Sequence, residues 1–338
     1  MADISLQKAR IALIGCGGTM SSLGTSRVDM MDYPEYGKKI TVQEVLDQVP
    51  EAADVAQVMA VPFRSVGSTA FTPKDWFELR DTIYRVIKED PQVAGVVIIH
   101  GTATLEETAF FLDMTLGLEV PVVVVGAQRP ISAIGSDAAL NLLNGLRVAA
   151  APASRGRGVL VVLNDEVHAA RDVIKAATLR VNTFRSADFG VLGVVDPDGL
   201  HYYRRLEPRP ASAPRFDQLP KLEHLPRVDI IYSYAGADGA LVDAAVAAGA
   251  KGLISAGLAP GIAAFHQVEA FNRARAAGVV VVQCTRSPSG RVANRRHLLA
   301  SGVISGEDFS PQKARILLAL GLITNAETEA LRALFQAY

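Results

Sequence analysis

The first half of the chain alternates between two kinds of hydrophobic pattern. Short runs of apolar, β-branched residues predict strands at residues 10–15, 95–99, 120–125 and 158–163. Stretches with apolar positions three and four residues apart predict helices at residues 41–48, 73–88, 106–116 and 136–149. Strands without a polar face, separated by helices, are typical of a mostly parallel sheet that is covered on both sides. We therefore expect an α/β fold whose ligands gather beyond the carboxyl ends of the strands.

The second half repeats this pattern after an interruption. Residues 184–203 predict two short strands around a turn at residues 196–199, which is the pattern of a hairpin. Residues 207–226 lack periodicity and contain five prolines, so we expect a linker there. The prediction is a larger N-terminal α/β domain of residues 1–206 and a smaller C-terminal α/β domain of residues 227–338.

The C-terminal domain is predicted from three strand-like runs and its last two helices. The runs are VDIIYSYAG, KGLISAGLA and GVVVVQC, and the helices lie around residues 312–320 and 326–336. Ser310 followed by Pro311 is a typical helix start, with serine as the N-cap and proline at the first helical position.

Composition and charge exclude several classes of function. Hydrophobic residues make up 49% of the 338 positions, and the formal net charge is −1 without a basic stripe. Nucleic acid is therefore not an expected partner. No apolar run approaches the ~18 residues that span a bilayer, and the N-terminus lacks the pattern of a secretory signal. Cys16 and Cys284 lie in or beside apolar runs, as buried thiols of a reducing compartment would, so we expect a soluble cytoplasmic protein.

The turn after the first strand, GCGGTM, offers a hydroxyl beside glycines. Glycines allow a ligand to approach the backbone, and successive N–H groups can hold an oxyanion, which makes Gly18 a candidate binding residue. Thr19 at the end of the turn is a candidate nucleophile; the alternative is a tight turn in which the threonine only caps a helix. The pattern is neither a G-x-G-x-x-G motif nor a phosphate-binding P-loop.

The turn after the second strand, HGTAT, contains two more hydroxyls. Thr104 could be a helix N-cap, with Glu107 three residues later completing a capping box. Thr102 then has no structural role and is the more interesting candidate. At the centre of this turn lies Ala103, whose methyl group is chemically inert.

The loop after the fourth strand contains Lys175 in an apolar stretch. Its side chain could reach the solvent along the surface, as such lysines often do. If it is buried beside a hydroxyl, its pKa falls and the neutral amine can act as a base. In the same loop, Asp165, Arg171 and Asp172 are expected to brace the chain by ion pairing.

No metal or cofactor is expected. The six histidines show no H-x-H or H-E-x-x-H spacing, and there is neither a C-x-x-C pair nor a G-x-S-x-G elbow. The remaining chemistry is that of threonine hydroxyls, one lysine and a few tyrosines acting on a small-molecule substrate.

Taken together, these stretches resemble the bacterial-type L-asparaginase/glutaminase family. The resemblance is carried by GCGGTM at 15–20, VVIIHGTATLEETAFFLDM at 96–114 and GVLVVLNDEVHAARDVIKAATLRVNTF at 158–184. Residues 120–146 and the segment SPQKARILLAL are also similar, so the resemblance covers nearly the whole chain. It implies hydrolysis of a side-chain amide through an acyl-enzyme.

The resemblance also implies roles for individual residues. Thr19 would be the nucleophile, and Thr102 with Lys175 would form a second pair of hydroxyl and amine. A tyrosine on the loop after the first turn would activate Thr19; Tyr33 and Tyr36 are both available, and Tyr33 is preferred. Backbone N–H groups at the two strand ends would hold the oxyanion.

Four departures from the family pattern concern recognition of an amino acid. The family has aspartate, which binds the α-amino group, where this chain has Ala103, and Ser-Gln or Ser-Asp where it has Ser68 and Thr69. The family asparagine that reaches the neighbouring subunit's site is replaced by Gly236. The turn that usually supplies a glutamate has no carboxylate and instead contains Arg291, Arg295, Arg296 and His297.

These departures predict a changed substrate with unchanged chemistry. Each charge-assisted hydrogen bond lost from an ammonium costs ~1.5–3 kcal/mol, so the loss of two weakens binding roughly a hundredfold or more. We expect the substrate to be an amide, cyclic imide or lactone without a free α-amino group. The alternatives are a genuine L-asparaginase/glutaminase and a family member that binds a ligand without catalysis. The arginines of the last turn could meet a substrate carboxylate, or form a solvated basic turn.

The resemblance finally predicts a homo-oligomer, since family members are commonly dimers of intimate dimers with sites at the dimer interface. Size-exclusion chromatography with light scattering should therefore give a mass that is a multiple of the 35.9 kDa chain. A monomer at micromolar concentration would contradict the prediction.

Overall fold

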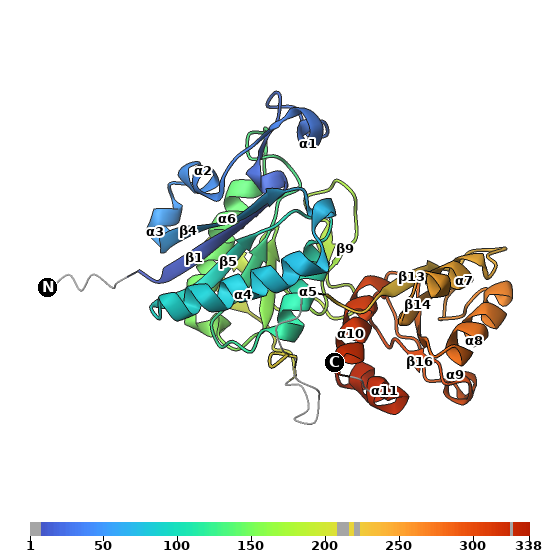
Figure 1. Cartoon of the computed structure of the whole chain (residues 1–338). Helices are drawn as coiled ribbons and strands as arrows, with labels where there is room; N and C mark the ends of the chain where they lie inside the picture. The colour runs from blue at the N-terminus through green and yellow to red at the C-terminus, as the bar shows by residue number, and fades with distance from the viewer. Residues whose placement is uncertain (1–7, 208–215, 220–223, 325–326) are drawn as a thin grey trace, which may run out of the picture. The chain divides into compact units, whose positions relative to one another are not determined.

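The chain is divided into two compact units, residues 1–206 and 207–338, both with α/β architecture (Figure 1). The computed structural model describes residues 8–207, 216–219, 224–324 and 327–338. Most of the predicted linker, residues 208–215 and 220–223, lies outside the described residues. The predicted fold class is confirmed: the larger N-terminal unit contains a mostly parallel sheet, and the C-terminal unit contains a smaller parallel sheet.

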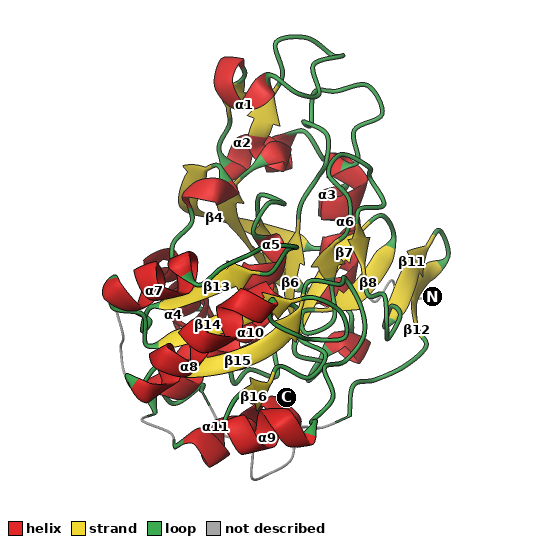
Figure 2. Cartoon of the chain, turned by 90° about the vertical axis from the view of Figure 1, so that its right-hand side faces the viewer, coloured by secondary structure: helices red, strands yellow, loops and turns green. Residues whose placement is uncertain are grey.

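The N-terminal unit is built on an eight-stranded sheet with the order β12-β11-β8-β7-β6-β5-β1-β4. The five strands from β7 to β4 are parallel, while β8, β11 and β12 add an antiparallel edge, visible in Figure 2. The bounds of the strands are β1 Arg10–Gly17, β4 Gln57–Val66, β5 Val93–Ile99, β6 Val122–Val125, β7 Val159–Leu163, β8 Glu166–Ala169, β11 Gly193–Asp196 and β12 Gly199–Tyr202. The last two form the predicted hairpin.

Helices cover both faces of this sheet, which explains why its inner strands have no polar face. One face packs against α2 (Val42–Asp47), α3 (Ala52–Val55) and α6 (Ala138–Ala150), and the other against α4 (Pro73–Glu89) and α5 (Leu105–Thr115), as Figure 1 shows. Side chains such as Leu13, Val97 and Leu142 are completely buried in the layer beneath α6. The helices and strands predicted in this half are all present, with ends at most two residues from the predicted ones.

One long strand, β4, was not predicted from the sequence. It pairs only with β1 and forms the edge of the sheet, and exposed and half-buried positions alternate along it. Its apolar residues are therefore less continuous than those of the inner strands, and it contains Pro62, which lacks the N–H group that a central strand would need. The omission matters because β4 leads directly into Ser68.

Two short antiparallel ladders follow the strands at the carboxyl edge of the sheet. A two-stranded ladder joins β2 (Ser22–Leu23) to β3 (Lys38–Lys39) and encloses the short helix α1 (Tyr33–Tyr36). A second ladder joins β9 (Ile174–Lys175) to β10 (Phe184–Arg185).

The C-terminal unit contains a parallel sheet with the order β13-β14-β15-β16. The strands are β13 Val228–Tyr232, β14 Gly252–Gly257, β15 Val280–Thr285 and β16 Ile304–Ser305, and the helices are α7 Ala240–Ala247, α8 Val268–Ala276, α9 Arg296–Ser301, α10 Pro311–Ile323 and α11 Thr328–Ala337. The predicted start of α10 is confirmed, with Ser310 as its N-cap and Pro311 in its first turn.

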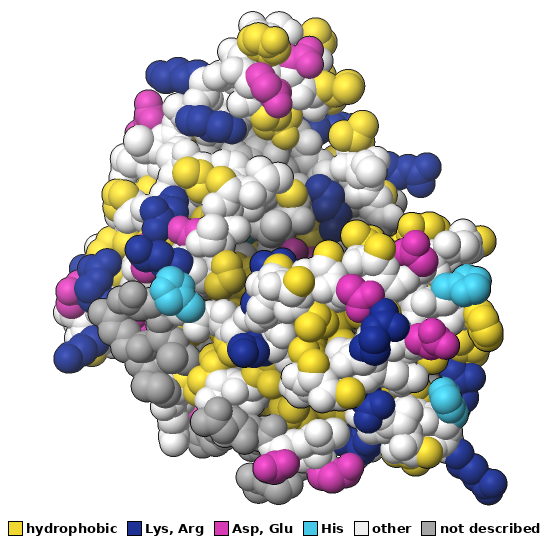
Figure 3. Space-filling model, turned by 45° about the vertical axis from the view of Figure 1, so that its right-hand side comes forward, with side chains coloured by type: hydrophobic (Ala, Val, Ile, Leu, Met, Phe, Trp, Pro, Cys, Tyr) yellow, Lys and Arg dark blue, Asp and Glu magenta, His cyan; other side chains and the backbone are white. Residues whose placement is uncertain are grey.

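Three further observations bear on the expectations from composition. Within the described residues, no helix is both long and apolar enough to cross a bilayer. Cys16 and Cys284 are both free and buried, and burial raises the pKa of each thiol. On the face of the molecule drawn in Figure 3, basic and acidic side chains are interspersed.

Candidate active site

Three turns meet where β1, β4 and β5 end, and glycines permit the contact. A Cβ atom placed on Gly18 would lie 2.3 Å from the Cα atom of Gly101, and one placed on Gly101 would lie 2.8 Å from Ser68 Cβ and Oγ. Gly18 also has a φ of 86°, a conformation that side chains disfavour. The residues that follow the two glycines, Thr19 and Thr102, are thereby brought to the same edge of the sheet.

Thr19 forms a hydrogen bond with Tyr33. The Thr19 Oγ1 and Tyr33 OH atoms lie 2.7 Å apart, and Thr19 is only 9% exposed. Tyr36, the alternative tyrosine, is 77% exposed. Burial raises the pKa of Tyr33, although its hydrogen bond with Thr19 acts in the opposite direction. The phenol is therefore protonated at neutral pH.

The loop that carries Tyr33 is attached at several points. Its two ends pair in the β2–β3 ladder, where Ser22 lies opposite Lys39. Beyond the ladder, the backbone N–H of Gly24 donates to Ser132 Oγ at 2.9 Å, and that of Ile134 donates to the Arg27 carbonyl at 2.8 Å. These contacts place Tyr33 beside Thr19.

Thr102 forms the second pair with Lys175. Lys175 Nζ donates to Thr102 Oγ1 at 2.8 Å, and Thr102 is 7% exposed. Burial lowers the pKa of Lys175, and the negative charge of Glu106 partly opposes this effect. Lys175 therefore does not extend along the surface as a solvated lysine would, and its amine is more easily deprotonated than that of an ordinary lysine.

Glu106 is a site residue that the sequence analysis did not identify. It is 5% exposed in the first turn of α5, and its Oε2 atom accepts a hydrogen bond from the backbone N–H of Lys175. The available signal was its place in the first turn of the helix that directly follows the HGTAT turn, which brings its side chain near that turn. The carboxylate anchors the β9 strand beside the HGTAT turn.

Ser68 holds the HGTAT turn in place. Ser68 Oγ accepts a hydrogen bond from the Ala103 N–H at 3.2 Å, and the Ser68 carbonyl accepts one from Thr104 Oγ1 at 3.0 Å. The predicted capping box at Thr104 is therefore wrong: Thr104 is the N-cap of α5, but its hydroxyl turns to the neighbouring loop and makes no cap hydrogen bond. Thr69 and Ala103 are both exposed, so a methyl group faces outward beside the Thr102–Lys175 pair.

His100 is buried and supports the HGTAT turn through hydrogen bonds. Its Nδ1 atom lies 2.9 Å from the Gly101 carbonyl, and its Nε2 atom lies 3.0 Å from Thr108 Oγ1, which in turn accepts a hydrogen bond from the Trp76 indole at 2.9 Å. Burial lowers the pKa of His100 to about 4, against the smaller opposing effect of the Gly101 carbonyl. The imidazole is therefore neutral at pH 7 and holds the backbone that carries Thr102.

The loop before Lys175 is braced largely as expected. Arg171 and Asp172 form an ion pair of 3.3 Å, and Arg204 lies 3.4 Å from the other oxygen of Asp172. Asp165 instead accepts a hydrogen bond from the Asn144 side chain at 2.8 Å.

In the C-terminal unit, the arginine-rich turn is held by Glu307. Arg291 Nη1 and Glu307 Oε2 are 2.6 Å apart, and Asn294 Nδ2 donates to Glu307 Oε1 at 2.7 Å. Arg295 donates to the Gly261 carbonyl at 3.0 Å. Arg291 thus already has a carboxylate partner within its own unit. Gly236 lies in a turn with a φ of 83° and has no neighbour within 4 Å of an added Cβ atom.

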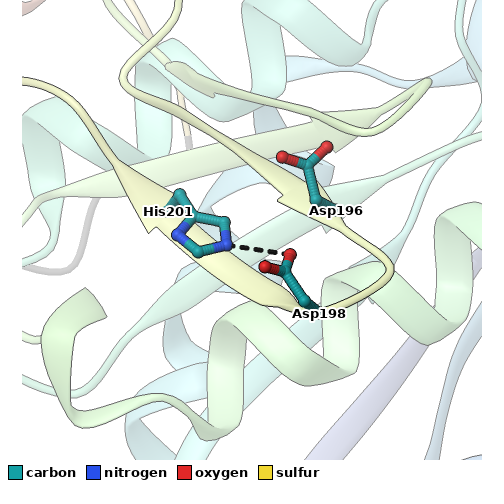
Figure 4. Close-up of side chains that lie close together, drawn as sticks. All are labelled: Asp196, Asp198 and His201. Carbon is teal, nitrogen blue, oxygen red and sulfur yellow. Dashed lines mark hydrogen bonds and ion pairs between the residues drawn. The ribbon is translucent and has the colours of Figure 1, made fainter.

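Within the described residues, one group of side chains has the composition and spacing of a metal site. Asp196, Asp198 and His201 lie on the β11–β12 hairpin with ligand atoms within 4.8 Å of one another, and all three are exposed (Figure 4). His201 Nε2 and Asp198 Oδ1 are 3.0 Å apart. Its D-x-D-x-x-H spacing is not a common metal-ligand motif, so the group could not be predicted from the sequence.

Comparison with known proteins gives matches over nearly the whole chain. Residues 10–208 match the N-terminal asparaginase domain, and residues 227–335 match the glutaminase/asparaginase C-terminal domain. L-asparaginase 2 of Bacillus subtilis is 35% identical over 97% of this chain and 86% of its own length. Glutaminase-asparaginase of Pseudomonas aeruginosa is 32% identical over 98% and 91%. The structure of a probable cytoplasmic L-asparaginase from Campylobacter jejuni has a TM-score of 0.90 at 33% identity, over 98% of this chain and all of that one.

The buried His100 generates a prediction about stability and pH. The unfolded chain binds a proton at this histidine near pH 6.5, whereas the folded chain does so only near pH 4. Stability is therefore lost as the pH falls from about 6.5 to 4. In His100→Gln, the free energy of unfolding measured with denaturant should fall less steeply with decreasing pH than in the wild type, by about 1.4 kcal/mol per pH unit across this window. The exposed His297→Gln is the control and should follow the wild type; equal slopes for all three proteins would contradict the prediction.

Proposed function

Because this chain belongs to the asparaginase family of amidohydrolases, we propose that it cleaves a small amide, cyclic imide or lactone without a free α-amino group, using Thr19 as the nucleophile. The observation that carries the proposal is the pairing of each threonine hydroxyl with a group that can move a proton: Thr19 with Tyr33 at 2.7 Å, and Thr102 with Lys175 at 2.8 Å. An unactivated hydroxyl is a poor nucleophile, so such partners are what the reaction requires.

In the first step, Thr19 Oγ1 attacks the carbonyl carbon of the substrate. The phenol of Tyr33 gives its own proton to the leaving nitrogen or oxygen ahead of taking up the Thr19 proton, so the phenol oxygen becomes partly negative during the transfer. The bond to the leaving group then breaks, and the acyl group remains as an ester on Thr19. Backbone N–H groups of the turns that contain Gly18 and Thr102 stabilise the negative charge on the carbonyl oxygen.

In the second step, water replaces the leaving group. We assign Thr102 and Lys175 to this part of the reaction, since burial lowers the pKa of the amine and favours its neutral, proton-accepting form. Water adds to the acyl carbon and gives a proton through Thr102 to the amine of Lys175. The ester bond to Thr19 then breaks, that proton returns through the same hydroxyl to the departing Thr19 oxygen, and the acid is released. Glu106 holds Lys175 by its backbone and leaves the amine free to contact Thr102.

The substrate class follows from what surrounds this machinery. At position 103, next to the Thr102–Lys175 pair, an exposed methyl group offers no charge to an ammonium. Ser68 is buried, and its hydroxyl already accepts a hydrogen bond from the N–H of Ala103. The exposed Thr69 contributes a neutral hydroxyl. We propose that Gly18, Ser68, Thr69 and Ala103 line the substrate site. Together they present the neutral hydroxyl of Thr69 and apolar surface without a carboxylate, so they favour a substrate with no cationic nitrogen.

We further propose that the protein is a cytoplasmic homo-oligomer. The proposed location follows the description of the C. jejuni relative. The C-terminal unit exposes several large hydrophobic side chains, among them Tyr232, Tyr234, Leu241, Ile262 and Phe265, the last of which is 84% exposed. Such residues are typical of a surface that another subunit covers.

The nucleophile is tested with a panel of amides, cyclic imides and lactones, with release of ammonia or acid as the readout. Wild type should turn over at least one member, and Thr19→Ala should reduce kcat by about a thousandfold or more, because the bond-forming oxygen is removed. Thr25→Ala is the matched control. Thr25 lies on the loop that carries Tyr33, is exposed and forms a hydrogen bond with Asp29, so the loss of its hydroxyl should leave kcat nearly unchanged. Turnover that survives in Thr19→Ala would refute the assignment, and ligand-induced thermal stabilisation without turnover would favour a binding protein.

The absence of ammonium recognition is tested with two substrates that differ only in the α-amino group, L-asparagine and the monoamide of succinic acid. Wild type should have the higher kcat/KM for the monoamide. Ala103→Asp should raise the ratio of asparagine to monoamide turnover by about tenfold or more, the effect of one added charge-assisted hydrogen bond. A wild type that already prefers asparagine would rule out the proposed substrate class.

A further inference from the structure

Lys39 lies near the ring of Tyr33 and is linked through Ser22 to Gly18, the residue before Thr19. Its Nζ atom donates to Ser22 Oγ at 2.8 Å and lies 5.9 Å from the centre of the Tyr33 ring. Ser22 is completely buried, and its hydroxyl donates to the carbonyl of Gly18 at 2.8 Å. One chain of contacts therefore runs from the tyrosine ring through Lys39 and Ser22 to the residue that precedes the nucleophile.

The position of Lys39 is fixed by the backbone. Lys39 is paired with Ser22 in the β2–β3 ladder, and this ladder closes the loop that contains Tyr33. Its neighbour Lys38 is paired with Leu23 and is exposed. Successive residues of a strand point to opposite faces, so only one of the two lysines can face the site.

The charges around Tyr33 give this lysine a function. Asp29, Asp137 and Glu35 each raise the pKa of Tyr33, in addition to the larger effect of burial, and the hydrogen bond with Thr19 lowers it. Negative charge that develops on the phenol oxygen during proton transfer would therefore be repelled by three carboxylates. An ammonium near the ring opposes this repulsion. Burial lowers the pKa of Lys39 itself, and Glu35 partly restores it.

We propose that Lys39 is a positioning residue of the Thr19–Tyr33 pair, which holds the tyrosine loop against Gly18 through Ser22 and stabilises negative charge on the phenol during proton transfer. This inference rests on the proposed function for the reaction that Tyr33 assists. The contact chain and the charge can nevertheless be measured without any turnover.

The test separates the charge of Lys39 from its bulk. Lys39→Met removes the charge and keeps a flexible apolar stem, Lys39→Arg keeps the charge, and Lys38→Met removes a charge of the same strand that faces away from the site. Each variant carries a fluorinated tyrosine at position 33, whose phenol loses its proton at lower pH than tyrosine does. Its titration is followed by fluorine NMR while circular dichroism verifies that the protein is folded.

The expected result is a pKa of the fluorinated residue at position 33 that is higher in Lys39→Met than in the unsubstituted protein. The shift should be about 0.5–1 pKa unit, the effect of a unit charge at the 5.9 Å that separates Lys39 Nζ from the centre of the ring, over which phenolate charge is partly delocalised, at an effective dielectric constant of about 40–80. Lys39→Arg and Lys38→Met should show no such shift. An unchanged pKa in folded Lys39→Met would overturn the proposal, and so would an equal shift in Lys38→Met.

Kinetics with a substrate found in the panel provide the second measurement. Without the fluorinated residue, Lys39→Met should reduce kcat by about three- to tenfold with little change in KM, because a rise of about 0.5–1 pKa unit costs about that factor in a step that requires this charge. Lys39→Arg should recover most of kcat. A KM effect alone would overturn the proposal. If no substrate is turned over, the proposed function fails, while the titration still decides the role of Lys39.

Discussion

The close approach of two backbone turns is the constraint on which the candidate site depends. Gly18 and Gly101 lie at the ends of the adjacent parallel strands β1 and β5, with no room for a side chain between them. Parallel pairing aligns the two strand ends, and the glycines let the turns touch, so the hydroxyls that follow them reach one edge of the sheet. The second turn is held from behind by the neutral His100 and from the side by Ser68. Rigid supports of this kind are what keep reactive groups in register.

The sequence predicted the parts of the structure that depend on continuous burial, and it missed those that depend on partial exposure. The inner strands and their covering helices could be located because apolar runs and helical periodicity are strong signals. Strand β4 was missed, since an edge strand needs only one buried side. Contacts between distant segments, such as Glu106 with Lys175 or Thr104 with Ser68, have no local signature. Thr104 illustrates this: its type and position fit a capping box, but a neighbouring carbonyl binds its hydroxyl instead.

In the proposed function, chemistry and recognition are carried by different parts of the same edge. The paired hydroxyls are buried and tied to the sheet, whereas Thr69 and Ala103, proposed here to meet the substrate, are exposed. A substitution at position 103 therefore alters what the site accepts while the hydrogen bond between Thr102 and Lys175 keeps its other supports. Under the proposed roles, a member of the asparaginase family could change its substrate while retaining the same fold. The same separation would explain why the fold alone says little about the substrate.

The loop that carries Tyr33 has a consequence for the timing of the reaction. It holds Tyr33 beside the proposed nucleophile and is attached to the 132–134 segment by two hydrogen bonds, one of them to the Ser132 side chain. Any movement that releases these two bonds and lifts the loop would also withdraw the phenol from Thr19. With the loop in that position, the Thr19 hydroxyl would have the reactivity of an ordinary alcohol. The nucleophile would then be activated only while the loop is closed, and this would limit acylation of Thr19 by compounds other than the substrate.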